Sequence, residues 1–375
     1  MSYQEKDILE ALSFVIEPDL KKDIVELNLV SNINIKDGLI YFNLQISNPA
    51  MHNKKRMVEA CELHLKRVLG TDVKIDINFS PLQKAPESPE PKDNSKILPN
   101  VKNIIAIASG KGGVGKSTVT ANLAVALAKK GYKVGLIDAD IYGPSMPVMF
   151  NVEGERPQSI EIDGKTWMQP VENYGVKLLS IGFFTGADQA VVWRGPMATR
   201  AVSQLFTEAN WGELDYMLID LPPGTGDIHL SLVQTVSVTG AVIVSTPQKV
   251  ALIDARKAVG MFKLSQINVP VLGFIENMAY FTPEELPNNK YYIFGQDGLK
   301  NLAESEGLPL LGQIPLVQSI RESGDVGRPV VLQENTPQAL AFMAFADNVI
   351  EQVELRNKTL DPTKKVELTN MNGCS

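Results

Sequence analysis

The chain of 375 residues carries a net charge of −7, and 44% of its residues are hydrophobic. This length suits about two globular domains, and the acidic balance argues against a broad nucleic-acid surface. No apolar run reaches the roughly 20 residues of a membrane span, and the N-terminus carries no apolar signal segment. Cys61 and Cys374 are too few for a disulfide framework, so we expect a cytoplasmic protein with neither nucleic acid nor membrane as a partner.

Residues 1–80 have the pattern of a small α+β domain. Ile8 and Leu12 share a helical spacing, and alternating apolar residues on both sides of Asp37 and Gly38 indicate a β-hairpin. We expect a second helix at 54–69, which contains Cys61, and a strand at 73–79. A lone helical cysteine usually packs as a small hydrophobe. Residues 81–100 are rich in proline and predict a semi-extended linker.

The stretch 104–117, IIAIASGKGGVGKS, predicts a phosphate-binding loop. A short aliphatic run reads as a buried strand, and a helix is expected directly after the loop, at 118–129. Glycines let backbone N–H groups surround a phosphate, a lysine adds charge, a serine hydroxyl can bind Mg2+, and the helix N-terminus favours anions. The predicted nucleotide-binding residues are Gly110, Gly112, Gly113, Val114, Gly115, Lys116, Ser117 and Thr118.

From residue 101 to about 355, strands alternate with helices, which predicts an α/β P-loop NTPase with a mostly parallel sheet covered by helices on both faces. Further strands are expected at 133–138, 176–181, 216–220, 241–245 and 271–277. Further helices are expected at 197–208, 231–236, 252–264, 299–306 and 337–352. Residues 356–375 are polar and predict a flexible tail.

Acidic residues end two of these strands, where ligands of such folds bind. Asp138 and Asp140 follow one strand and suit Mg2+ and water positioning, although either could be a turn aspartate. Asp220 ends another and leads into a Pro/Gly loop, in which Gly224 could offer its N–H to a γ-phosphate. We expect His229, just beyond, to be a structural or interface residue.

These motifs, in this order, resemble the deviant-Walker ATPases of the MinD/ParA type, and within them the Mrp/ApbC group of ATP-binding iron–sulfur cluster carriers. The residues that carry the resemblance are SGKGGVGKST (109–118), IDADIYGPS (137–145), WRGPM (193–197), IDLPPGTGD (219–227), STPQ (245–248), ENM (276–278) and GQIP (312–315). The N-terminal domain resembles the MIP18-like domain fused to such factors, without the cysteine that this domain commonly carries after its hairpin.

The resemblance implies a role for each matching residue. Lys111 would reach across a homodimer to the partner's phosphates, alongside Lys116 in its own subunit. Asp140 would position the attacking water, while Asp138 and Asp220 would join Ser117 around Mg2+. Asn277 would recognise adenine, and the backbone near Pro315 would close the base pocket.

One departure concerns the cluster. Carriers of this group usually have Cys-x-x-Cys shortly after ENM, so that a dimer supplies four thiolates to one [4Fe–4S] cluster. Pro283 and Leu286 stand at those positions. Cys374 is the only plausibly accessible thiol, and two copies fall short of four ligands.

We therefore expect an ATP- and Mg2+-dependent homodimeric ATPase that carries iron–sulfur clusters between scaffold and apoprotein clients. One alternative is a cluster-free ATPase adaptor or chaperone. Another is a positioning ATPase, and a third, a nucleotide-dependent metabolic enzyme such as a ligase, would need a substrate pocket that no motif marks.

Overall fold

The structure, a computed structural model, describes residues 5–17, 22–36, 39–46, 51–70, 73–81, 97–184, 195–283, 285–286 and 289–363. The chain forms two compact units, Met1–Lys92 and Asp93–Ser375. Within the described residues, no helix combines the length and the hydropathy needed to cross a bilayer.

The first unit packs two helices on a three-stranded sheet of order β1-β2-β3. Its elements are α1 (Glu5–Leu12), β1 (Val30–Lys36), β2 (Leu39–Ile46), α2 (Met51–Leu69) and β3 (Lys74–Pro81). Strands β1 and β2 form the expected antiparallel hairpin, and β3 lies parallel to β2. Phe42 on β2 and Cys61 on α2 are fully buried in its core.

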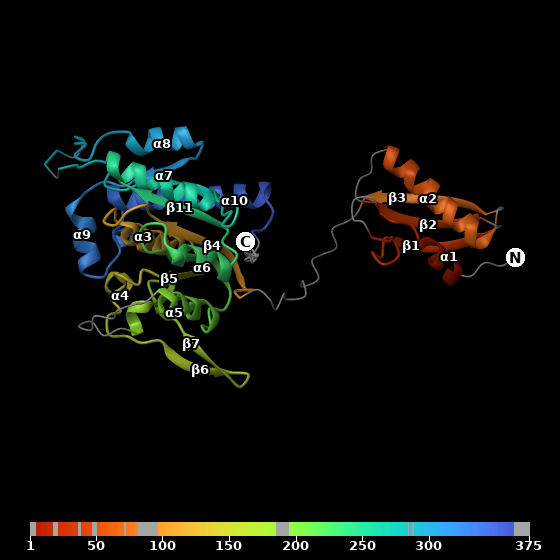
Figure 1. Cartoon of the computed structure of the whole chain (residues 1–375), viewed down its shortest axis with the longest axis horizontal. Coiled ribbons are helices and arrows are strands. Elements are labelled where there is room, and N and C mark those ends of the chain that lie inside the picture. Colours follow the sequence, from red (N-terminus) through yellow and green to blue (C-terminus); the bar gives the residue numbers. More distant parts are fainter. Residues whose placement is uncertain are drawn as a thin grey trace, which may run out of the picture. The chain divides into compact units, whose positions relative to one another are not determined.

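The second unit is built on an eight-stranded sheet of order β13-β12-β11-β4-β10-β5-β9-β8. Its strands are β4 (Val101–Ala108), β5 (Val134–Asp138), β8 (Val171–Asn173), β9 (Val176–Ser180), β10 (Leu214–Asp220), β11 (Gly240–Ser245), β12 (Val271–Glu276) and β13 (Leu310–Gln313). All neighbouring pairs are parallel except β8 and β9, which are antiparallel. The predicted α/β class with a mostly parallel sheet is confirmed (Figure 1).

Helices cover both faces of this sheet. The helices are α3 (Lys116–Lys129), α4 (Met146–Met149), α5 (Gly195–Thr207), α6 (Asp227–Thr235), α7 (Lys249–Lys263), α8 (Gly298–Glu306), α9 (Gln318–Asp325) and α10 (Pro337–Thr359). On β4, Ile104 packs in the core under α5 to α8, whereas Ile105 packs in the core under α3 and α10. Because successive strand residues point to opposite faces, a strand buried on both faces must be apolar at every position. This is why residues 104–108, the buried part of β4, form a continuous apolar run.

Several boundaries differ from expectation. Helix α6 begins at Asp227 rather than 231, and α10 continues to Thr359, so the expected domain end at 355 falls inside a helix. Arg356, placed by the sequence in the tail, is only 7% exposed and donates to the Asp361 carbonyl and the Thr363 hydroxyl, each at 2.7 Å. Residues 356–359 thus form the last turn of α10, and Arg356 holds residues 361 and 363 against the end of this helix. Residues 364–375 lie outside the described part of the chain.

Several short strands were not expected from the sequence. These are β8, β13 and the hairpin of β6 (Gln158–Ile162) and β7 (Lys165–Gln169), which forms a separate two-stranded sheet (Figure 1). The hairpin is largely exposed, so few of its side chains are apolar. The alternation of Ile160 and Ile162 with Glu161, directly before Asp163 and Gly164, is a hairpin signal that could have indicated it,.

Candidate functional site

The predicted phosphate loop lies between the end of β4 and the start of α3, as its spacing requires. Gly113 and Gly115 have φ angles of +80° and +79°, in the left-handed region that favours glycine. A Cβ on Gly115 would overlap with the Asn277 amide, and one on Gly110 would overlap with the Asp254 carbonyl group on α7. Gly110 is therefore required by the packing of a distant helix as well as by the loop itself.

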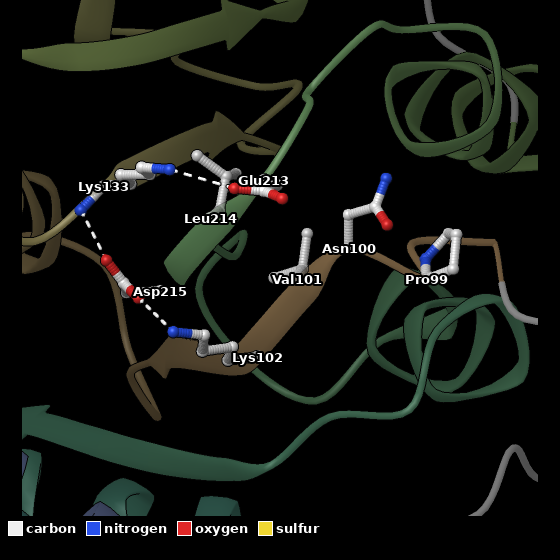
Figure 2. A pocket seen from close by; sticks show the side chains of 8 residues that line it. All are labelled: Pro99, Asn100, Val101, Lys102, Lys133, Glu213, Leu214 and Asp215. Atoms are coloured by element: carbon white, nitrogen blue, oxygen red, sulfur yellow. Dashed lines mark hydrogen bonds and ion pairs between the residues drawn. The ribbon is translucent and has the colours of Figure 1, made fainter. Parts of the chain in front are cut away.

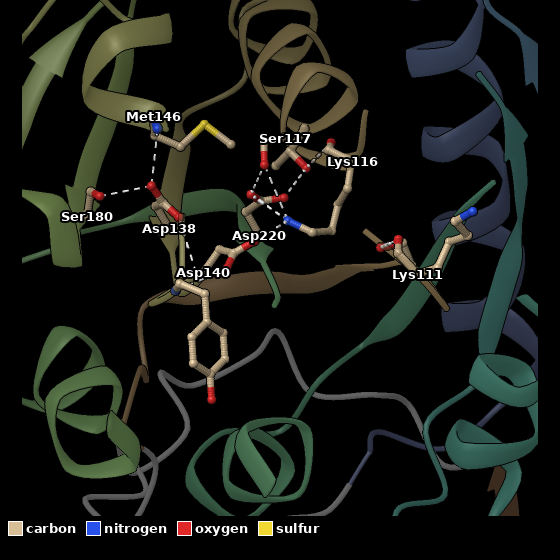
Figure 3. Close-up of polar contacts among 11 residues, drawn as sticks. Lys111, Lys116, Ser117, Asp138, Asp140, Met146, Ser180 and Asp220 are labelled. Atoms are coloured by element: carbon tan, nitrogen blue, oxygen red, sulfur yellow. Dashed lines mark hydrogen bonds and ion pairs between the residues drawn. The ribbon is translucent and has the colours of Figure 1, made fainter. Parts of the chain in front are cut away.

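The loop lysine lies in a cluster of acidic side chains (Figure 3). Lys116 Nζ lies 2.8 Å from Asp220 Oδ2 and 3.5 Å from Asp140 Oδ2. The Ser117 hydroxyl donates to Asp220 Oδ2 at 2.6 Å, and the Thr120 hydroxyl donates to Asp220 Oδ1 at 2.7 Å. The ends of β4, β5 and β10 thus bring together residues separated by about a hundred positions in the sequence,.

Asp138, like Asp220, is fully buried. Its Oδ1 accepts from the Asp140 N–H at 3.2 Å, and its Oδ2 accepts from the Met146 N–H at 3.1 Å and the Ser180 hydroxyl at 2.9 Å. Burial, and then the nearby Asp220 carboxylate, raise the pKa of Asp138 to about 7. Both oxygens are used within the fold, so a structural contribution is evident, and its role around Mg2+ stays a prediction.

Asp140 is placed to interact with solvent or a ligand. Its side chain is 13% exposed and faces the Lys116 ammonium group. Burial raises the pKa of Asp140, and the Lys116 charge partly offsets this increase. A partly exposed carboxylate with a raised pKa beside the loop lysine suits water positioning.

The loop that follows Asp220 is held against the phosphate loop. The Gly224 N–H, which the sequence predicts for a γ-phosphate, donates to the Ser109 carbonyl at 2.9 Å. This bond would have to break before Gly224 could contact a nucleotide.

Asn277 supports the other side of the phosphate loop. Its side-chain amide donates to the Val114 carbonyl at 2.8 Å, and the residue as a whole is 5% exposed. Pro315 is also buried, and the neighbouring Ile314 carbonyl accepts from the Ala279 N–H at 2.9 Å. The first contact places Asn277 beside the loop. The recognition of adenine by Asn277 and Pro315 stays a prediction.

Lys111 is separate from the acidic cluster. Figure 3 shows its side chain directed away from Asp138, Asp140 and Asp220. It is half-buried. Cys374 lies outside the described residues, as do the first two residues of the WRGPM motif.

Two contacts at the site were not expected from the sequence. Thr120 lies one helical turn after Lys116, and this spacing could have indicated it,. Ser180 ends β9 beside β5, and its contact with Asp138 depends on strand order, which the sequence does not state.

The pocket in Figure 2 lies elsewhere, at the N-terminal ends of β4 and β10. It encloses about 440 Å³. Lys102 and Asp215 pair across it at 2.8 Å, and Lys133 and Glu213 pair at 3.0 Å. Because nucleotides bind such sheets at the carboxyl ends of strands, this pocket is not the nucleotide site.

Comparison with known proteins settles the family. Residues 100–350 match the family described as NUBPL iron-transfer P-loop NTPase, and residues 5–77 match a family of iron–sulfur cluster assembly proteins. The chain belongs to the NUBPL iron-transfer P-loop NTPase family. The predicted Mrp/ApbC-type resemblance, the P-loop NTPase fold and the ATPase class are confirmed.

Relatives match both units. An iron–sulfur cluster carrier protein of Synechocystis is 43% identical over 93% of this chain and 97% of its own length. The iron–sulfur cluster transfer protein NUBPL of Dictyostelium discoideum is 43% identical over 72% of this chain and 82% of its own. Among solved structures, a nucleotide-binding protein of Archaeoglobus fulgidus in complex with ADP matches with a TM-score of 0.55 and 38% identity, over 66% of this chain and 93% of its own.

Proposed function

We propose that the protein is an ATP-hydrolysing carrier or assembly factor that delivers iron–sulfur clusters to apoproteins and works as an ATP-linked homodimer. The observation that best supports this proposal is the cluster of Lys116, Ser117 and Asp220 next to a phosphate loop with glycines of positive φ. The same chain also matches a family of iron–sulfur cluster assembly proteins.

The side chains suit hydrolysis of a triphosphate. Loop N–H groups would bind the phosphates, and Lys116 would exchange its Asp220 partner for phosphate oxygens. Asp140 would then be free to orient a water toward the γ-phosphorus, with ADP as the leaving group. Ser117 and Asp220 present oxygen ligands that fit Mg2+, which would neutralise phosphate charge when bound.

Cluster carriage depends on few thiols. In the described part of the chain, no three His, Cys, Asp or Glu side chains gather into a metal-binding group. Burial raises the pKa of the Cys61 thiol to about 12, so it is a poor metal ligand. Leu286, at one of the two positions where the resemblance implies cysteine, is 48% exposed. We therefore infer that Cys374, together with ligands from a partner or client, holds the cargo.

Anaerobic reconstitution with iron and sulfide tests this assignment. We expect iron bound by the wild-type chain and by Cys61→Ala, and loss of that iron in Cys374→Ser. A wild-type dimer that retains no iron would reject cluster carriage and favour the cluster-free adaptor, which the absence of cysteine at Pro283 and Leu286 also supports.

The homodimer proposal depends on Lys111. Its ammonium group forms no ion pair within the described residues, so it is available to a partner's phosphates. Sedimentation with Mg-ATP should show association of the wild-type chain and weaker association of Lys111→Ala, with nucleotide affinity retained. Equal association of the two chains would contradict the cross-subunit role.

A further inference from the structure

Helix α6 carries a buried histidine whose ring nitrogens have no hydrogen-bond partner among the described residues. His229 is 2% exposed, and neither Nδ1 nor Nε2 has a hydrogen bond within the described part of the chain. Its backbone N–H is satisfied by the Gly226 carbonyl at 3.1 Å. Leaving buried polar atoms unpaired is costly, and folded proteins rarely do so without a reason. A leucine at this position would avoid the cost, as Leu232 and Val233 do on the same buried side of the helix.

The position of His229 links it to the nucleotide site. Helix α6 begins immediately after the loop 221–226, which starts at Asp220 and is held by the bond between Gly224 and Ser109. The Lys116 charge also acts on the imidazole. A movement of the loop toward a phosphate would therefore act directly on the first turn of α6, where His229 lies.

The imidazole of His229 is able to form new hydrogen bonds. Burial lowers the pKa of His229 to about 4, the backbone of Gly226 partly opposes this shift, and the Lys116 charge adds a smaller decrease, so the imidazole is neutral at pH 7. A neutral imidazole offers one N–H donor and one acceptor nitrogen, and neither nitrogen of His229 has a partner in hydrogen-bond geometry among the described residues.

We propose that His229 is a positioning residue for ATP hydrolysis, whose imidazole gains hydrogen bonds when the loop 221–226 leaves Ser109 and closes on the γ-phosphate. The unpaired ring nitrogens destabilise the arrangement in which Gly224 is bonded to Ser109, and the new hydrogen bonds stabilise the arrangement closed on the γ-phosphate. This inference rests on the ATPase activity proposed above and adds a residue to it.

Steady-state kinetics give the first test. His229→Leu removes the unpaired polar atoms, so it should unfold at the same or a higher temperature than the wild-type chain. It should bind Mg-ATP within about twofold of the wild-type affinity, while its turnover falls about tenfold, as expected for one lost positioning contact. His229→Gln, which keeps a donor and an acceptor, should recover much of this turnover. His64→Gln, the same change on α2 of the other unit, should leave turnover unaltered.

Nitrogen NMR on the wild-type chain gives a second test that needs no stable variant. The sequence has three histidines, His52, His64 and His229, so 15N-labelled imidazoles can be assigned by single substitutions. Mg2+ with a non-hydrolysable ATP analogue should shift the His229 ring signals and leave those of His64 in place.

The outcomes are separable. If the wild-type chain hydrolyses ATP while His229→Leu turns over at the same rate and the ring signals do not move, the positioning role is overturned. If the wild-type chain does not hydrolyse ATP at all, both this inference and the proposed function are rejected.

Discussion

The Lys116 ammonium group lies 2.8 Å from Asp220 Oδ2, and the two side chains are 6% and 0% exposed. A buried pair of this kind contributes little relative to an apolar pair, but removing one partner leaves an uncompensated charge. The ends of β10 and α3 thus depend on each other in the folded chain.

We expect Asp220→Ala to lower the free energy of unfolding by about 3 kcal/mol. Among the described residues, Lys116 would be left buried with one ion-pair partner, Asp140, at 3.5 Å. The double variant Lys116→Met/Asp220→Ala should lose less than the sum of the two single variants. The three tryptophans of the sequence all belong to the second unit: Trp167, Trp193 and Trp211. Urea unfolding followed by tryptophan fluorescence therefore reports on this unit alone. Simple additivity of the two changes would show that the pair is not coupled.

Gly110→Ala should destabilise the same unit and weaken nucleotide binding, because a Cβ there would overlap with the Asp254 carbonyl group. Backbone atoms must move to accept it, and overpacking of this kind costs about 1–3 kcal/mol. Gly260→Ala on α7, the helix that contains Asp254, is a matched control, since nothing lies within 4 Å of the Cβ that alanine would add there. It should be neutral or stabilising by up to about 1 kcal/mol. Equal thermal midpoints for the two variants would contradict the packing argument.

Stability should depend on pH through Asp138. Its pKa is about 7 in the folded chain and about 4 in an unfolded one. Between these values the folded chain holds a proton that the unfolded chain has released, so this group makes the free energy of unfolding fall as pH rises. Its contribution is fully present below about pH 4 and lost above about pH 7.

Asp138→Asn should remove this component, so the difference in unfolding free energy between variant and wild type should change across that range in the absence of Mg2+ and nucleotide. Asp215→Asn is a control for which the pH dependence of the unfolding free energy has the opposite sign, because a hydrogen bond from Lys102 lowers the pKa of Asp215,. Parallel pH profiles for wild type and Asp138→Asn would exclude the buried carboxyl as a cause.

Much of the site follows from local sequence. The glycine spacing before Lys116 identifies the phosphate loop, and acidic residues at the ends of β5 and β10 predict that Asp140 and Asp220 meet it. The prediction for Asp140 and Asp220 depends on a general property of parallel sheets, in which the carboxyl ends of the strands lie along one edge.

Other features depend on tertiary contacts that no local pattern encodes. Gly110 is constrained by α7, more than a hundred residues away, and Arg356 keeps residues 356–363 on the domain despite their polar composition. The bond between Gly224 and Ser109 belongs to a loop conformation, and the loop residues alone predict only that the loop can move.

Calorimetric titration with Mg-ATP tests the central claim, that the glycine loop and Lys116 bind a triphosphate. The wild-type chain should release or absorb a saturable heat, and Lys116→Ala should show none over the same concentrations. The absence of heat in the wild-type chain at millimolar nucleotide, or equal binding by Lys116→Ala, would contradict the account.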